Sequence, residues 1–117
     1  MKAELKAKWL TALRSGLYRK SCNTLKRHYK TQVGYCCLGV LCDVITPEFP
    51  DAQELVEKEY YTSPGSTPKS KNAMLDHPTM RYVGLDQTQQ RKLSTMNDNG
   101  ASFSTIADYI ERRIPGE

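Results

Sequence analysis

The sequence predicts one mainly α-helical domain, a compact bundle of about four to five short helices with a small β-hairpin at about 23–34. Apolar residues recur at helical spacing in three separate segments, near residues 5–17, 37–45 and 103–110. The chain has 117 residues, a length at which a single domain can bury a core without metal or disulfide support. We therefore expect a single domain over residues 1–117, with an α+β arrangement as the alternative.

The first expected helix covers about Ala3 to Ser15. Its apolar stripe consists of Leu5, Trp9, Ala12, Leu13 and Leu17. Gly16 suits the left-handed position that often follows the end of a helix. We expect Trp9 to belong to the core, and stacking on a ligand is the less favoured role.

Residues 17–33 are basic, and their apolar residues lack helical periodicity. The segments 23–26 and 28–31 are expected to pair as a short hairpin. No Asn-Gly or Asp-Gly turn marks this hairpin, so a long ordered loop is the alternative.

A buried helix is expected to follow and to end before Pro47. Its stripe has the spacing i, i+3, i+4, i+7 and i+8, with Cys37, Val40, Leu41, Val44 and Ile45. Gly39 inside this helix lowers helix propensity, which indicates a close approach of a second helix. We expect Cys37, on the stripe, to be buried, and Cys36, off the stripe, to be more accessible.

An N-cap signature opens the next expected helix. Asp51 with Glu54 resembles a capping box before an acidic helix that ends at about Glu59. The following segment, at about 62–72, is rich in Ser, Thr, Pro, Gly and Lys. It predicts a mobile loop rather than a domain linker.

A second capping box, Asp86 with Gln89, predicts a helix that runs through position 96. The Asn-Asp-Asn-Gly sequence of residues 97–100 predicts a turn after it. Ser102 would then cap a last helix that ends before Pro115. The apolar stripe of that helix is Phe103, Ile106, Ala107 and Ile110.

Charge is sorted along the chain. Residues 1–30 carry nine Lys or Arg against one acidic residue, whereas the remainder carries eight basic and twelve acidic residues. This asymmetry favours an anionic partner, or contact between basic and acidic parts of neighbouring subunits in a homo-oligomer, and a plain solvated surface is an equal alternative. No apolar run reaches eighteen residues, and the Lys-rich start lacks the features of a signal peptide, so we expect a cytoplasmic protein without membrane contact.

The four cysteines are expected to be free thiols. Cys22, Cys36, Cys37 and Cys42 lack the paired spacing of a zinc site, so no metal site is expected. A cysteine-nucleophile enzyme is the fallback, because a thiol at a helix N-terminus favours thiolate and His28 or His77 would be its base, oriented by Asp43 or Asp76. Nothing in the sequence brings these groups together. We therefore expect a protein that is not an enzyme, with no catalytic residues and no cofactor.

The basic segment gives the clearest indication of a partner. Arg and Lys bind phosphate and Tyr offers a stacking surface, a combination typical of nucleotide or single-strand binding. The chain lacks a phosphate-cradling GxxxxGK[ST] loop, which argues against phosphate transfer. Asn97 and Asp98 are expected to satisfy backbone donors of the turn and the next helix. The second possibility is that they hydrogen-bond a ligand, because polar turn residues near helix starts often carry function. The predicted ligand-binding residues are Tyr18, Arg19, Lys20, Lys26, Arg27, Tyr35, Asn97 and Asp98.

Four motifs in this order resemble a group of short proteins encoded by bacteriophages and prophages. They are Trp9, Ser15-Gly16-x-Tyr18, Tyr35-Cys36-Cys37-Leu38-Gly39-Val40-Leu41-Cys42-Asp43, and Asn97-Asp98-x-Gly100-x-Ser102-Phe103-x-x-Ile106-Ala107. The chain departs from the group where Arg19-Lys20 stand in place of an expected Gln. The resemblance implies a phage accessory protein in the cytoplasm of a host cell, and it carries over no catalytic residues.

These observations lead to a first hypothesis and two alternatives. The first is a counter-defence protein that binds and sequesters a nucleotide-derived anionic signalling molecule without turning it over. The second is a nucleic-acid-binding module. The third is an inhibitor that docks on a host defence enzyme.

Overall fold

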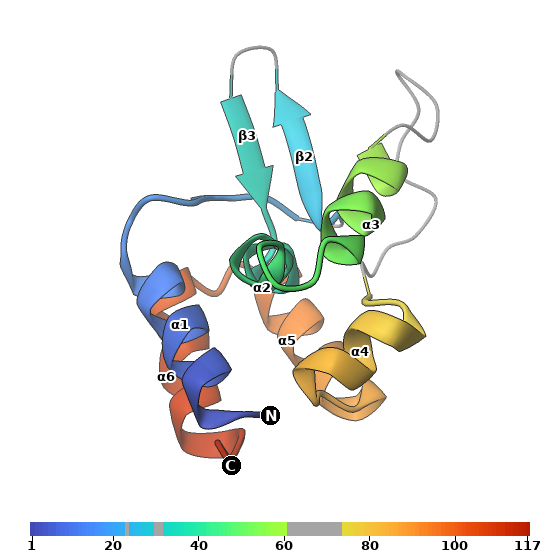
Figure 1. Cartoon of the computed structure of the whole chain (residues 1–117). Coiled ribbons are helices and arrows are strands. Elements are labelled where there is room, and N and C mark those ends of the chain that lie inside the picture. The colour runs from blue at the N-terminus through green and yellow to red at the C-terminus, as the bar shows by residue number, and fades with distance from the viewer. Residues whose placement is uncertain (23, 30–31, 61–73) are drawn as a thin grey trace.

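Six helices and three short strands form the computed structural model, which describes residues 1–22, 24–29, 32–60 and 74–117 (Figure 1). The helices are α1 (Ala3–Arg14), α2 (Cys37–Ile45), α3 (Asp51–Tyr60), α4 (His77–Val83), α5 (Gln87–Asp98) and α6 (Phe103–Arg113). The strands are β1 (Arg19–Lys20), β2 (Lys26–Tyr29) and β3 (Gln32–Tyr35). The predicted mainly α-helical domain is confirmed. The expected mobile loop at about 62–72 lies outside the described residues.

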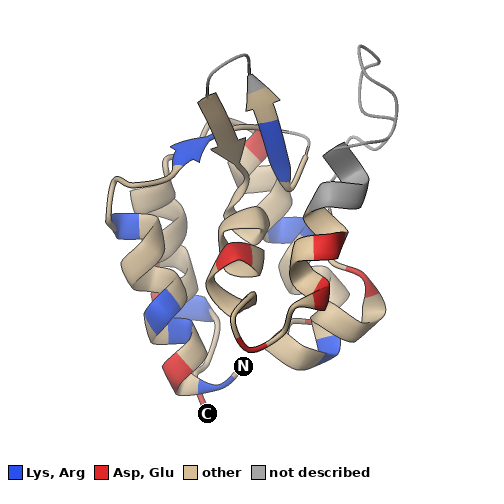
Figure 2. Ribbon diagram, turned by 45° about the horizontal axis from the view of Figure 1, so that its top comes forward, with Lys and Arg blue, Asp and Glu red and all other residues tan. Residues whose placement is uncertain are grey.

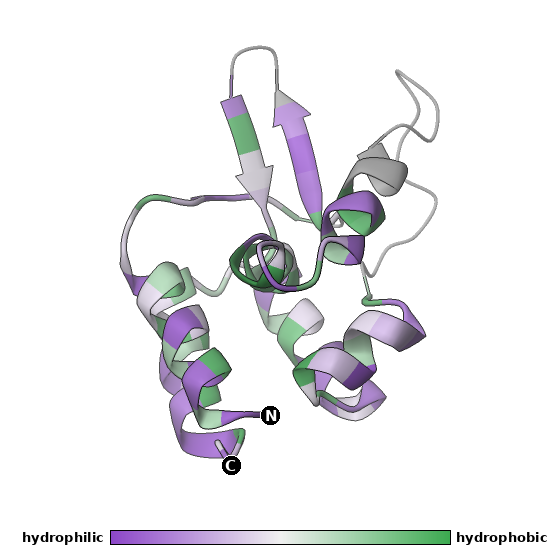
Figure 3. Ribbon diagram, viewed as in Figure 1, coloured by the Kyte–Doolittle hydropathy of each residue, from purple (hydrophilic) through white to green (hydrophobic). Residues whose placement is uncertain are grey.

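Helix α2 is the centre of the core. Its residues are buried around nearly the whole helix, with Asp43 and Val44 as the exceptions. Helices α1, α3 and α5 pack against it, and Figure 3 shows it as the most uniformly hydrophobic helix. The expected burial of Trp9 is confirmed, because its side chain is fully buried and its Nε1 donates a hydrogen bond to the carbonyl of Cys37 at 2.9 Å.

Gly39 lets the chain that enters β2 lie directly on α2. A Cβ atom at Gly39 would stand 1.7 Å from the carbonyl oxygen of Leu25. The same oxygen accepts a hydrogen bond from the backbone N–H of Cys36 at 3.1 Å. A close approach was expected here, but its partner is the backbone at Leu25 and not another helix.

The three strands form one small sheet in the order β1-β3-β2. β1 runs parallel to β3, and β2 is antiparallel to β3. The hairpin is therefore present, but the predicted pairing of 23–26 with 28–31 is wrong. The strands lie later in the chain because Leu25 is buried in the core against α2 and β2 begins only after it. β1 is two residues long, too short to leave a periodic signal.

The predicted helix ends are largely confirmed. Asp86 and Gln89 form a reciprocal capping box, with bonds of 2.7 and 2.9 Å, and Ser102 Oγ accepts from the N–H of Thr105 at 3.1 Å. Helix α3 begins at Asp51 itself, so Asp51 lies in the first turn instead of at the cap. The short helix α4 was not predicted. Asp76 caps it by accepting from the N–H of Thr79 at 3.0 Å.

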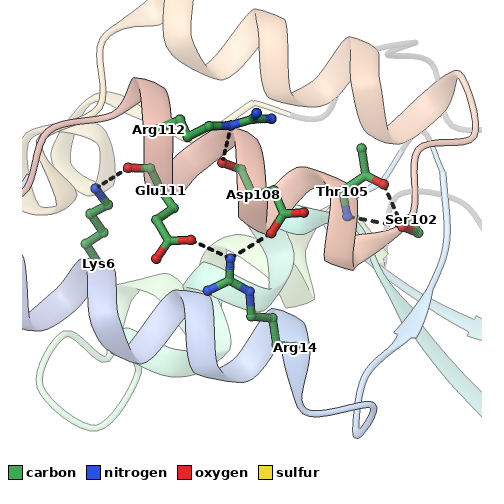
Figure 4. A network of polar contacts seen from close by, with 7 residues as sticks. All are labelled: Lys6, Arg14, Ser102, Thr105, Asp108, Glu111 and Arg112. Atoms are coloured by element: carbon green, nitrogen blue, oxygen red, sulfur yellow. Dashed lines mark hydrogen bonds and ion pairs between the residues drawn. The ribbon is translucent and has the colours of Figure 1, made fainter.

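The basic N-terminal part meets acidic groups within the same chain. Arg14 on α1 forms ion pairs of 2.8 Å with both Asp108 and Glu111 on α6 (Figure 4). Lys6 donates to the carbonyl of Glu111, and Lys8 lies 3.8 Å from the carboxylate of Glu48. Contact between basic and acidic parts therefore occurs inside one chain, and the homo-oligomer stays a prediction.

None of the helices in the described part of the chain combines the length and apolar character needed to cross a bilayer.

Candidate functional site

Three residues, one on each strand, form a row across the small sheet at the C-terminal end of β3. In register, Lys20 on β1 and Lys26 on β2 both pair with Tyr35 on β3. Residues paired in register carry their side chains on the same face of a sheet. Lys20 and Lys26 therefore lie on either side of Tyr35 on that face, and the Nζ of Lys26 lies 5.7 Å from the centre of the Tyr35 ring, within cation–π distance. Figure 2 shows basic residues on β1 and β2 and none on β3 between them.

Tyr18 joins this row just before β1. Its ring meets the Tyr35 ring edge to face, with the centroids 5.0 Å apart. Its phenol donates a hydrogen bond to Oδ2 of Asp43 on α2. Partial burial and the neighbouring carboxylate both raise the pKa of Tyr18, and the same two causes raise the pKa of Tyr35. Both phenols thus stay protonated through the neutral pH range and can act as hydrogen-bond donors.

Two residues of the row, Tyr35 and Lys26, line a pocket of about 120 Å³ between the sheet, α2 and α3. Gly39 lies in its wall. Among the described residues, the wall carries one cation, one carboxylate, an aromatic ring and further polar and apolar groups. The lining residues are Lys26, Tyr35, Gly39, Asp43, Thr46, Gln53 and Val56.

The two predicted arginines lie on the other face of the sheet. Arg19 and Arg27 both pair in register with Gly34, so their side chains flank a position without a side chain. Alternation along each strand places this row opposite the Lys20–Tyr35–Lys26 row. The structure therefore divides the predicted basic cluster between two faces.

Asn97 lies apart from the pocket, and backbone groups engage its side chain. The predicted turn at 97–100 begins two residues too early, because α5 continues to Asp98. The Asn97 side chain is fully buried, and its Oδ1 accepts from the backbone N–H of Cys37 at 3.2 Å. Its Nδ2 donates to the carbonyl of Ser21 at 2.8 Å. Since its amide is engaged by backbone groups, we leave Asn97 out of the site, together with its neighbour Asp98, which does not line the pocket.

The cysteines belong mainly to the core. Cys37 is buried as expected, and burial raises the pKa of its thiol well above the usual value. The expectation that Cys36 is more accessible is wrong, because Cys36 is also buried. Its sulfur caps α2 by accepting from the N–H of Gly39 at 3.4 Å. Within the described residues, no group of three His, Cys, Asp or Glu side chains is arranged to hold a metal ion.

The two histidines lie on separate elements. His28 is in the middle of β2, and His77 begins α4. Neither lines the pocket beside Tyr35.

Sequence reasoning missed the part of the pocket that α2 and α3 supply. Asp43, Thr46, Gln53 and Val56 come from α2, the residue that follows it and α3, which were not predicted to bind a ligand. One feature of the sequence pointed to Asp43, since it is the sole charged residue in the apolar stretch from Tyr35 to Ile45. The fold turns this residue toward the sheet, where it meets Tyr18.

A second hollow of about 160 Å³ lies between α1, the end of α2 and α4, and its lining includes Leu5, Val44 and Tyr82. None of the predicted ligand-binding residues lines it.

Comparison with known proteins gives one match. The model of a family described as a domain of unknown function (DUF8296) matches residues 1–114. No curated protein and no solved structure matches the chain.

Proposed function

The chain belongs to the family of the domain of unknown function DUF8296, and we propose from the geometry of its pocket that it binds a nucleotide-type anion and holds it without turnover. The observation that carries this proposal is the row of Lys20, Tyr35 and Lys26 on one face of the sheet. A lysine in register on each side of an aromatic residue suits a phosphate next to a planar base.

The distribution of ion pairs supports an anionic ligand at the sheet. Lys8 and Arg14 are engaged by acidic residues of the same chain. Within the described residues, Lys20 and Lys26 have no carboxylate within ion-pair distance. The positive charges of Lys20 and Lys26 therefore remain available to a partner.

The carboxylate of Asp43 favours a small ligand over a long nucleic-acid strand. It shares the pocket with Lys26, so the pocket is not uniformly basic. A continuous phosphate backbone laid across it would meet a like charge, whereas a single nucleotide can present donors to Asp43 and phosphate to Lys26.

The setting that we propose is phage counter-defence in the cytoplasm of a host cell. Its support is the resemblance of the motif that runs from Tyr35 to Asp43 to short bacteriophage and prophage proteins. A protein that sequesters a host signal needs a compact scaffold and a tight pocket, and it needs no residues for bond cleavage. The buried Cys37, with its raised pKa, is consistent with a thiol that serves packing.

Calorimetric titration tests this function. The purified chain is titrated with nucleoside monophosphates, cyclic dinucleotides and ADP-ribose. At least one of them should bind saturably, and Lys26→Gln should weaken that binding by roughly tenfold, because a charge-assisted hydrogen bond is lost. Arg81→Gln is the matched control, because it removes one exposed positive charge on α4 and should leave the affinity unchanged. The absence of heat with every ligand would contradict the proposal.

A nucleic-acid-binding module is the second candidate, and the pair Arg19 and Arg27 on the opposite face of the sheet favours it. It predicts affinity that rises with strand length and falls steeply with salt. Gel shifts of single- and double-stranded DNA and RNA at two salt concentrations separate the candidates. Tight binding of long strands that Arg19→Gln weakens and Lys26→Gln does not would favour this second function.

A further inference from the structure

Asp43 presents an unused acceptor to the pocket. One of its carboxylate oxygens, Oδ2, accepts the hydrogen bond from Tyr18. In the described part of the chain, no hydrogen bond reaches the other oxygen, Oδ1, and the side chain is exposed. An ionised carboxylate only accepts hydrogen bonds, and its two oxygens together offer about four lone-pair positions. A ligand that displaces water from Asp43 therefore has to bring hydrogen-bond donors to it.

Tyr18 fixes how the carboxylate faces the pocket. Its phenol holds Oδ2, and its ring rests against the Tyr35 ring, so the carboxylate is oriented relative to the aromatic row. Tyr18 is thus a positioning residue, and Asp43 is the group that would touch the ligand.

A positively charged side chain, Lys26, lines the same pocket as Asp43. Lys26 lines the wall from β2 and extends over the Tyr35 ring, whereas Asp43 lines it from α2. A ligand that binds both side chains carries hydrogen-bond donors for the Asp43 carboxylate and an anionic group for the Lys26 ammonium. It also has a planar part that contacts Tyr35.

We propose that Asp43 makes this pocket selective for guanine nucleotides, an inference that rests on the proposed nucleotide binding. Guanine presents two adjacent donors, N1–H and the N2 amino group, and these match the two oxygens of one carboxylate. Adenine and cytosine place a ring-nitrogen acceptor beside their amino group, so that a lone pair would face the carboxylate. Hypoxanthine keeps N1–H but lacks the amino group, and xanthine replaces that group with an oxygen.

The selectivity is tested by calorimetric titration of the wild-type chain with GMP, IMP, XMP and AMP. GMP should bind most tightly, and the other three should bind at least roughly tenfold more weakly, because each lacks one or both donors. This comparison needs no variant, so it does not depend on the folding of a mutant. ITP and GTP repeat the comparison with a longer phosphate chain.

Asp43→Asn provides the reciprocal test. The amide offers one acceptor and one donor, which match N1–H and the 2-oxygen of xanthine. The variant should therefore lose GMP affinity and gain XMP affinity, each by roughly tenfold. Asp51→Asn, which removes one exposed carboxylate at the start of α3, is the matched control and should keep the wild-type preference.

The possible outcomes distinguish a failure of the guanine selectivity from a failure of the proposed nucleotide binding. Equal binding of GMP, IMP, XMP and AMP would overturn the guanine selectivity and leave nucleotide binding intact. The absence of binding by all nucleotides would overturn both. A preference for GMP that Asp43→Asn leaves unchanged would show that another residue reads the base, and it would overturn the role of Asp43.

Discussion

Gly39 shows how a single residue positions the pocket. The backbone at Leu25 rests where a side chain at Gly39 would be, and this contact brings the start of β2 onto α2. Lys26, the next residue, then lies over the Tyr35 ring and beside the pocket. The sequence signalled a close approach, because glycine is costly inside a helix. It could not identify the partner, because nothing local marks the backbone at Leu25.

Gly39→Ala should destabilise the fold by at least about 3 kcal/mol, because the added methyl group overlaps a backbone oxygen that cannot rotate away. Chemical denaturation followed by circular dichroism measures the change. Gly16→Ala is the matched control. It has open space around it but a φ of +76°, so it should cost only about 1 kcal/mol of backbone strain. Equal losses of stability for the two variants would refute the contact between Gly39 and Leu25.

At the scale of elements, α5, α2 and β1 are joined through Asn97. Its side chain accepts from the first N–H of α2 and donates to the carbonyl that follows β1. The amphipathic helices were predictable, because burial of an apolar stripe follows from its period. The position of Asn97 was not, because Asn-Asp-Asn-Gly has the local character of a turn. Here the hydrogen bonds to distant backbone groups outweigh that preference.

Asn97→Leu should lower the free energy of unfolding by about 3 kcal/mol, because the buried N–H of Cys37 and carbonyl of Ser21 would lose their partner. Asn99→Leu changes the same residue type on an exposed position two residues later and should alter stability by no more than about 0.5 kcal/mol. Thermal and urea denaturation of both variants measure the difference. If Asn97→Leu is as stable as the wild type but loses ligand binding, Asn97 belongs to a binding site after all.

For the whole molecule, the fold sorts the basic residues into two groups. Lys8 and Arg14 on α1 meet acidic groups of Glu48 and of α6, whereas the basic residues on the strands flank Tyr35 and Gly34. The basic segment was visible in the sequence as a candidate site. How the basic segment divides between the two faces of the sheet depends on strand register. The hairpin signal in the sequence was too weak to predict that register. The contribution of Asp43 depends on how α2 packs against the sheet.

The most direct measurement is nuclear magnetic resonance mapping of the ligand site. Amide ¹H–¹⁵N spectra of the labelled chain are recorded while GMP is added. The account predicts saturable shifts centred on Lys20, Lys26, Tyr35, Gly39 and Asp43, with the same midpoint for all of them, and little change around Leu5 and Tyr82 at the second hollow. The result that would contradict it is the absence of saturable shifts, or saturable shifts confined to the second hollow.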